Sequence, residues 1–223
     1  MKRASVPFLM IVLTLSIGLT AASIMAVGPV NLYAATPVAV PCESLYKKKA
    51  VPAKTLQALL RAHERWVEYR GDPEARRAEL CQADLSRAAL AGANLERAQL
   101  KGALLRQANL RQTSLIQASL AEADLSKAVL EDSNLSGADL RRARLAGANL
   151  TRAIGDEAAL FYAALIGAKL REVSFERAQL QGADFTSADL SDGNFIDASF
   201  YGATLHSAVL SNTDLSEADL RRT

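Results

Sequence analysis

From Leu80 onward, large apolar side chains recur at every fifth position. Of the 29 positions at this spacing from Leu80 to Leu220, 28 hold Leu or Phe, and only Gly155 interrupts the row. The position two residues before each of them is Ala in 24 of the 29 cases, and most other positions are polar or glycine. The pattern therefore predicts two inward-facing side chains, one small and one large, in every quintet.

A spacing of five fits neither a helix nor a plain strand. In an α-helix five residues advance by ~500°, about 140° beyond a full turn, so the leucines would not form a stripe. In an unbroken strand an odd repeat would place successive leucines on opposite faces. The spacing instead predicts a short extended piece and a bend in every quintet, with alanine and leucine pointing inward together.

At these quintets the sequence resembles the pentapeptide-repeat family, whose consensus is A-(D/N)-L-x-x. The segments "GADLRR", "GANLER" and "GADFTS" match this consensus, and the resemblance covers residues 78–223. It implies an all-β solenoid, a right-handed quadrilateral parallel β-helix with four quintets per coil and about seven coils. The Asp or Asn between the inward pair, as at Asp84 and Asn94, is interpreted as structural, because it can accept hydrogen bonds from main-chain N–H groups near the bend.

Residues 54–71 are predicted to form a short N-terminal capping α-helix over the first coil. Gly71 and Pro73 are expected to end it. A β-helix exposes its interior at its ends, and an amphipathic helix is the usual cover. His63 is interpreted as part of that interface and not as a metal ligand, because no second ligand stands at a helical spacing from it. The apolar side of the helix holds Leu56, Leu59, Leu60, His63, Trp66 and Val67.

The first residues have the features of an export signal. Lys2 and Arg3 precede an apolar run that turns into small residues, and no charged residue occurs between Ala4 and Cys42. Residues 1–26 are therefore predicted to be a signal peptide, followed by a linker over residues 27–53. The alternative is an uncleaved anchor over residues 6–30, which is long enough to span a bilayer. In both cases the rest of the chain is expected in the periplasm or an equivalent exported compartment.

Cys42 and Cys81 are the only cysteines of the chain. In an oxidising compartment such a pair is expected to form a disulfide, which would stabilise the fold by about 2–4 kcal/mol. The alternative is two unrelated thiols.

Charge and motifs argue against several functions. The chain has 26 basic and 24 acidic residues, too even a balance for nucleic acid or an anionic membrane as the main partner. Contact with a membrane is expected only if residues 1–26 are retained. The sequence has no G-x-S-x-G, no Walker loop and no Cys/His metal spacing, and its two histidines are His63 and His206. We therefore expect no enzyme, no catalytic residue, no cofactor and no metal.

Five apolar side chains occupy outward positions in the later coils. With four quintets per coil, Phe161 and Tyr201 share one column, two coils apart. The alternatives to a partner site are scattered exposure, or a bulge near Gly155 that turns Phe161 inward. The candidate patch for a protein partner is Phe161, Tyr162, Ile166, Ile196 and Tyr201.

The sequence stops at "DLRRT", immediately after a repeat centre. An open last coil predicts an end-to-end homodimer through that coil. The alternative is that Arg221 and Arg222 act as charged gatekeepers against such pairing.

Together these features predict a non-catalytic protein-binding or scaffold module that acts outside the cytoplasm. One alternative follows from the family, some members of which resemble duplex DNA and bind gyrase: a DNA-mimicking topoisomerase regulator. This chain departs from those acidic members, because residues 27–223 hold 24 basic and 24 acidic groups. The other alternative is a membrane-anchored structural rod.

Overall fold

The computed structural model describes residues 45–69 and 74–223. The predicted signal peptide and Cys42 lie outside the described residues. Within these two ranges, no helix combines the length and the hydropathy that a bilayer crossing requires. All described residues belong to one compact unit, Pro41–Thr223.

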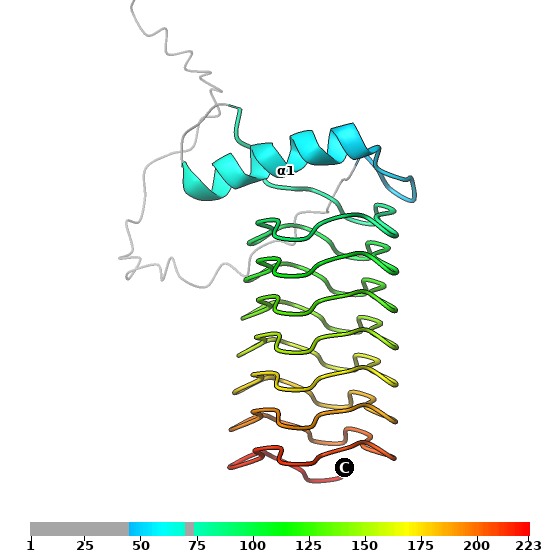
Figure 1. Cartoon of the computed structure of the whole chain (residues 1–223), viewed down its shortest axis with the longest axis vertical. Helices are drawn as coiled ribbons and strands as arrows, with labels where there is room; N and C mark the ends of the chain where they lie inside the picture. The colour runs from blue at the N-terminus through cyan, green and yellow to red at the C-terminus, as the bar shows by residue number, and fades with distance from the viewer. Residues whose placement is uncertain (1–44, 70–73) are drawn as a thin grey trace, which may run out of the picture. The chain divides into compact units, whose positions relative to one another are not determined.

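From Glu79 to Asp219 the chain pairs with itself in a constant register, in which each bridged residue meets its equivalent four quintets later. The parallel bridges begin with Glu79 and Gln99 and end with Ser199 and Asp219. Each is a single-residue bridge, and no longer strand forms in residues 45–69 and 74–223. Four quintets therefore complete one coil, and the coils stack directly on one another (Figure 1). This is the parallel β-helix, with four quintets per coil, that the resemblance to the pentapeptide-repeat family implies.

The interior is a stack of large side chains separated by alanines. From Leu80 to Phe200 every Leu or Phe at the central position is at most 2% exposed. Burial of each such side chain stabilises the fold by about 1.5–3 kcal/mol. Four phenylalanines fill the later coils, with the rings of Phe195 and Phe200 5.4 Å apart between centroids. The inward pair predicted for each quintet is therefore confirmed.

Each quintet ends in a corner of two residues. The second residue of every corner has a positive φ, from 54° at Gln117 to 69° at Gly92. The next residue closes the corner, as where Ala83 N donates to Leu80 O at 3.1 Å, and the result resembles a type II turn. The predicted role of Asp84 is confirmed, because its Oδ1 accepts a hydrogen bond from Ser86 N at 3.0 Å.

The corners form four columns that run along the stack. We call corner I the column that begins at residues 81–82 and recurs once in every coil, at every fourth quintet. Corners II, III and IV begin in the same way at residues 86–87, 91–92 and 96–97. Corners II and IV are therefore the two neighbours of corner I, and corner III lies opposite to it.

Helix α1 (Ala53–Glu68) precedes the coils. Its buried face packs against the first coils: Leu56 is 7% exposed, and Leu59 and Leu60 contact the core cluster. The helix begins one residue before the predicted range 54–71 and ends at Glu68. Gly71 and Pro73, which were expected to end it, lie outside the described residues.

His63 ties α1 to the start of the coils. The ring is 0% exposed, and its Nδ1 accepts a hydrogen bond from the main-chain N–H of Ala78 at 3.1 Å. The ring also stacks on Trp66 with 5.5 Å between centroids. Burial lowers the pKa of His63 from its ordinary value of 6.5, and the charge of Arg77 acts in the same direction, while the main-chain carbonyl of Glu96 opposes both. The prediction that His63 belongs to the helix interface is confirmed.

Part of the predicted linker, residues 47–51, is hydrogen-bonded to the first coil. Lys48 N donates to Gln82 O at 2.7 Å, and Val51 N donates to Asp84 O at 3.2 Å. Lys48 has a φ of 56°, as the second residue of a corner does. Residues 47–51 therefore pair with the first coil ahead of α1, which the polar run of lysines did not indicate.

The backbone is regular at Gly155, so the predicted alternative of a bulge is wrong. Ile154 bridges to Ser174, and Gly155 N donates to Ser174 O at 2.7 Å, as the central residues of the other quintets do up to Phe200. Gly155 also lacks the positive φ that marks a corner. Phe161 therefore keeps its outward position.

Candidate functional site

The five residues of the predicted patch do not form one surface. Phe161, Tyr162 and Tyr201 lie on corner I, whereas Ile166 lies on corner II and Ile196 on corner IV. The five residues are spread over three corners, because outward residues of successive quintets fall on successive corners. The prediction that Phe161 and Tyr201 share a column is confirmed by the register of four quintets per coil.

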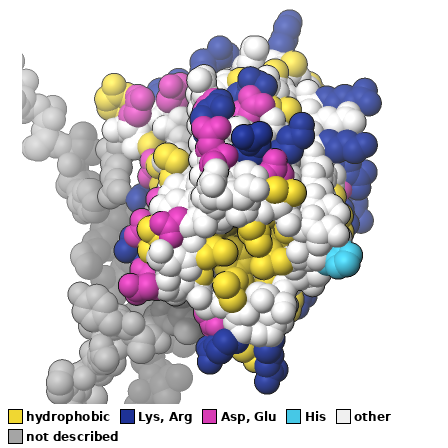
Figure 2. Space-filling view, turned by 60° about the horizontal axis from the view of Figure 1, so that its bottom comes forward, with side chains coloured by type: hydrophobic (Ala, Val, Ile, Leu, Met, Phe, Trp, Pro, Cys, Tyr) yellow, Lys and Arg dark blue, Asp and Glu magenta, His cyan; other side chains and the backbone are white. Residues whose placement is uncertain are grey.

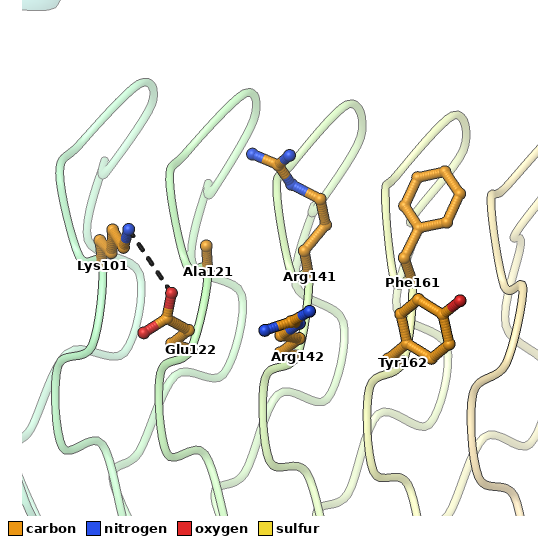
Figure 3. Close-up of a pocket in the computed structure, with 7 residues that line it drawn as sticks. All are labelled: Lys101, Ala121, Glu122, Arg141, Arg142, Phe161 and Tyr162. Atoms are coloured by element: carbon orange, nitrogen blue, oxygen red, sulfur yellow. Dashed lines mark ion pairs between the residues drawn. The ribbon is translucent and has the colours of Figure 1, made fainter. Parts of the chain in front are cut away.

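Tyr162 is the most exposed aromatic residue of corner I, at 67%. Its ring extends over Gly182, the equivalent residue of the next coil, where an added Cβ would lie 2.6 Å from two ring carbons. Glycine at 182 therefore lets the ring lie against the main chain. Phe161, half-buried, stands beside Tyr162 (Figure 3).

Tyr201 lies further along the same corner, next to two arginines. The guanidinium carbons of Arg221 and Arg222 are 5.7 and 5.3 Å from its ring centroid. Both distances fall within the range of cation–π contacts. The ring of Tyr201 is therefore already contacted by this chain, unlike the outer face of Tyr162.

A surface hollow of about 460 Å³ lies on corner I before the aromatic pair. Ala121 forms its floor, because this side chain ends at Cβ while the same position holds long side chains in the coils on either side (Figure 3). Ala121 is 7% exposed. The hollow is lined by Lys101, Ala121, Glu122, Arg141, Arg142, Phe161 and Tyr162.

The cations of the hollow differ in their partners. Lys101 Nζ lies 3.5 Å from Glu122 Oε1. Arg141 binds both carboxylate oxygens of Asp139 at 2.7 Å. Burial alone would raise the pKa of Asp139, but the Arg141 guanidinium outweighs it and holds that pKa below its usual range. Arg142 is exposed and has no ion pair with any residue of the described ranges.

A second ion cluster lies on the side between corners I and II. Asp124 is 2% exposed and accepts hydrogen bonds from Ser126 and from Arg106, while Arg144 Nη2 donates to it at 3.0 Å. Burial alone would raise its pKa, but the hydrogen bonds from Ser126 and Arg106 lower the pKa of Asp124 to about 2. The carboxylate of Asp124 is paired with two arginines of this chain, so we interpret this cluster as structural.

The described residues offer no metal site, since no group of three or more His, Cys, Asp or Glu side chains within them converges. Cys81 is 2% exposed in the first coil and is not a free thiol. Because Cys42 lies outside the described residues, the Cys42–Cys81 disulfide stays a prediction.

Sequence reasoning missed Arg142, Glu122 and the hollow over Ala121. A signal for them exists: aligning the chain on itself at four quintets per coil places Lys101, Ala121, Arg141 and Phe161 in one column. The hollow becomes apparent only when the short side chain of Ala121 is compared with the long side chains of Lys101 and Arg141, one coil away on either side.

The family model described as "Pentapeptide repeats" matches this chain in eight copies, from residues 75–107 to residues 183–222. The chain therefore belongs to the pentapeptide repeat family. Its right-handed quadrilateral β-helix is the fold of this family. No curated protein gives a significant match.

Several solved structures of pentapeptide repeat proteins are similar. HetL, involved in heterocyst differentiation regulation in Nostoc sp. strain PCC 7120, is 36% identical over 63% of this chain and 71% of HetL, with a TM-score of 0.37. QnrB1, a plasmid-mediated fluoroquinolone resistance protein, is 21% identical over 63% of this chain and 74% of QnrB1, with a TM-score of 0.42. A protein of the Arabidopsis thaliana thylakoid lumen is 30% identical over 43% of this chain and 63% of its own, with a TM-score of 0.23.

Proposed function

We propose that this protein is a non-catalytic binding module that holds a protein partner on corner I. The observation that carries the proposal is the exposed ring of Tyr162, which stands with Phe161 beside Arg142, a cation without an ion pair in the described ranges. Tyr and Arg are enriched among the residues that dominate binding energy at protein interfaces. The stacked coils hold these side chains on a rigid surface, so little conformational entropy is lost when a partner binds.

The module is proposed to act outside the cytoplasm. Support comes from the basic, apolar and small-residue order of residues 1–26. The membrane-anchored rod would require that residues 6–30 are retained. The DNA-mimicking alternative requires a strongly acidic surface, and it is not favoured, because the lining of the corner I hollow holds three cations and one carboxylate.

We also propose an end-to-end homodimer through the last coil. Leu210 and Leu220 occupy central positions of their quintets but are 38% and 39% exposed. Figure 2 shows hydrophobic side chains gathered on this end of the described chain. Such an apolar end would be covered by a second copy.

The dimer is tested by the molar mass of the purified protein in light scattering. We expect a dimer for the wild-type protein and a monomer for Leu220→Glu. Ile166→Glu serves as the control, since Ile166 is similarly exposed, at 44%, but lies on corner II. A monomeric wild-type protein would refute the dimer.

The partner site is tested by photo-cross-linking in the native host. A benzophenone amino acid replaces Tyr162 in one variant and Glu172, at the matched position of corner III, in another. We expect a discrete cross-linked protein from position 162 and none from position 172. Identical patterns from the two positions would show that corner I is not a partner site.

A further inference from the structure

We propose that the hollow of corner I binds an extended acidic segment of the partner, in which carboxylates flank an apolar side chain. This inference rests on the proposed function and assigns the chemistry of the partner. Arg142 would bind a carboxylate, and the apolar side chain would cover the rings of Phe161 and Tyr162.

The charges of the hollow favour an acidic ligand at one end. Lys101 is compensated by Glu122 and Arg141 by Asp139. Arg142 is the cation of the lining without an ion pair in the described ranges, and it stands directly before the aromatic pair (Figure 3). A guanidinium can bind a carboxylate through two parallel hydrogen bonds, which gives both strength and orientation.

The aromatic end of the hollow is positioned in advance. Gly182 backs the Tyr162 ring, because any side chain at 182 would meet ring atoms at 2.6 Å. The outer face of the ring stays in water, with 67% of the residue exposed. An apolar side chain of the ligand would remove this surface and part of Phe161 from water.

The dimensions of the hollow suit a short extended peptide. Lys101 and Phe161 are three coils apart, about 14 Å at the ~4.8 Å spacing of paired strands. That distance corresponds to about four extended residues. The ligand does not add as a strand, because the main chain of corner I is already paired between coils, as where Arg142 N donates to Phe161 O at 2.9 Å. Side chains therefore carry the recognition.

A single-stranded nucleic acid also has aromatic bases and negative charge, but the carboxylates in and beside the hollow disfavour its binding. Glu122 lines the middle of the hollow, and Asp139 adjoins Arg141. A phosphate backbone carries a charge at every nucleotide and would pass these carboxylates. A peptide can place one carboxylate opposite Arg142 and leave its other charged side chains in solvent, away from Glu122 and Asp139.

The test measures binding of three hexapeptides by isothermal titration calorimetry. The peptide EDLFDE has carboxylates and apolar residues, QNLFNQ keeps only the apolar residues, and EDGSDE keeps only the carboxylates. We expect EDLFDE to bind the full chain with a Kd of about 1 mM or lower, and the other two to bind at least about tenfold more weakly.

Two variants place the peptide on corner I. Arg142→Gln and Tyr162→Ser introduce residue types that the second position of a corner already holds at Gln107 and Ser187, so we expect both variants to keep the fold. Each is expected to weaken EDLFDE at least about tenfold. Arg152→Gln on corner III is the control and should leave binding unchanged.

Four results would overturn the assignment. The first three are no binding of EDLFDE, equal binding of EDLFDE and QNLFNQ, and no effect of Arg142→Gln. The fourth is tighter binding of a twelve-nucleotide oligothymidylate that is lost in Arg142→Gln, which would assign the hollow to nucleic acid. If one of the first three results is found while position 162 still gives cross-links, the protein-binding function stands and only the acidic-peptide ligand is excluded.

Discussion

The ring of Phe175 occupies the space in which a side chain at Gly155, one coil earlier, would lie. A Cβ at Gly155 would be 2.0 Å from Cε1 and 2.4 Å from Cδ1 of the ring. Phe175 is 0% exposed, and the hydrogen bond from Gly155 N to Ser174 O is kept at 2.7 Å. The missing side chain at Gly155 therefore makes room for the ring of Phe175 in the next coil, and the hydrogen bonds between the two coils are unchanged.

Replacing Gly155 by Leu, the residue of nearly every other quintet, should destabilise the protein. The added side chain would overlap a ring enclosed on all sides, and we expect a loss of about 3 kcal/mol or more in the free energy of unfolding. The double variant Gly155→Leu, Phe175→Leu restores the regular pattern and should recover most of that loss. Urea unfolding followed by circular dichroism measures the free energy of unfolding of both variants. A double variant no more stable than Gly155→Leu would show that the Phe175 ring does not depend on the space at Gly155.

Acid should weaken the attachment of α1 through His63. Burial lowers the pKa of His63 below 6.5, so the folded protein keeps the neutral ring whose Nδ1 accepts from Ala78 N. Below pH 6.5 the unfolded chain binds a proton that the folded chain does not, so the free energy of unfolding falls as pH falls. Above that pH the residue makes no such contribution, and the slope is at most about 1.4 kcal/mol per pH unit.

Urea unfolding between pH 7.5 and 5.5 measures this dependence. We expect His63→Gln to remove it, because the new side chain does not titrate. His206→Gln is the matched control, since His206 is exposed at corner II and should leave the dependence intact. A wild-type protein whose stability is constant over this range would exclude the role of His63.

Asp124 should contribute to stability through its charge. Its pKa is lowered from 3.8 to about 2 in the folded protein. The contribution is therefore fully present above pH 3.8 and is lost as pH falls through 2. We expect Asp124→Asn to lower the free energy of unfolding at pH 7 by about 2 kcal/mol.

Asp184→Asn is the control for Asp124. Asp184 stands three coils later in the same column and accepts hydrogen bonds from Thr186, but it has no ion pair with the described residues. The loss for Asp184→Asn should be clearly smaller. Equal losses would show that the Ser/Thr hydrogen bond, and not the arginines, carries the effect.

The predicted export and disulfide are tested together by the intact mass of the protein from its native host. We expect a chain that begins near Ile24 or Val27, with cysteines that react with iodoacetamide only after reduction. Cys42→Ser should then lower the free energy of unfolding by about 2–4 kcal/mol, because the closed loop is lost. A full-length chain with two reactive thiols would place the protein in a reducing compartment.

The coils could be predicted from the sequence because their pattern is local and repeats in every quintet. The spacing alone predicts that side chains such as Leu80 and Ala83 are buried in the core. The column shared by Phe161 and Tyr201 follows from four quintets per coil. Ile166 and Ile196 lie on opposite corners, because they are six quintets apart and four quintets complete one coil. The hollow over Ala121 could not be read from one quintet, since it depends on side chains one full coil away on either side.

Each quintet forms one of the four sides of a coil, so adding or removing one quintet turns the rest of the chain by one corner about the axis of the β-helix. The main-chain hydrogen bonds between coils are the same on all four sides. We therefore expect a deletion of one quintet to keep the core and these hydrogen bonds but to turn every later side chain by one corner relative to α1. Loss of one quintet between Glu122 and Arg141 would separate the Ala121 floor from the Arg142–Tyr162 end without unfolding a single coil. Gain or loss of quintets is thus a means by which such a protein can change the set of side chains that face a partner while its stability stays nearly constant.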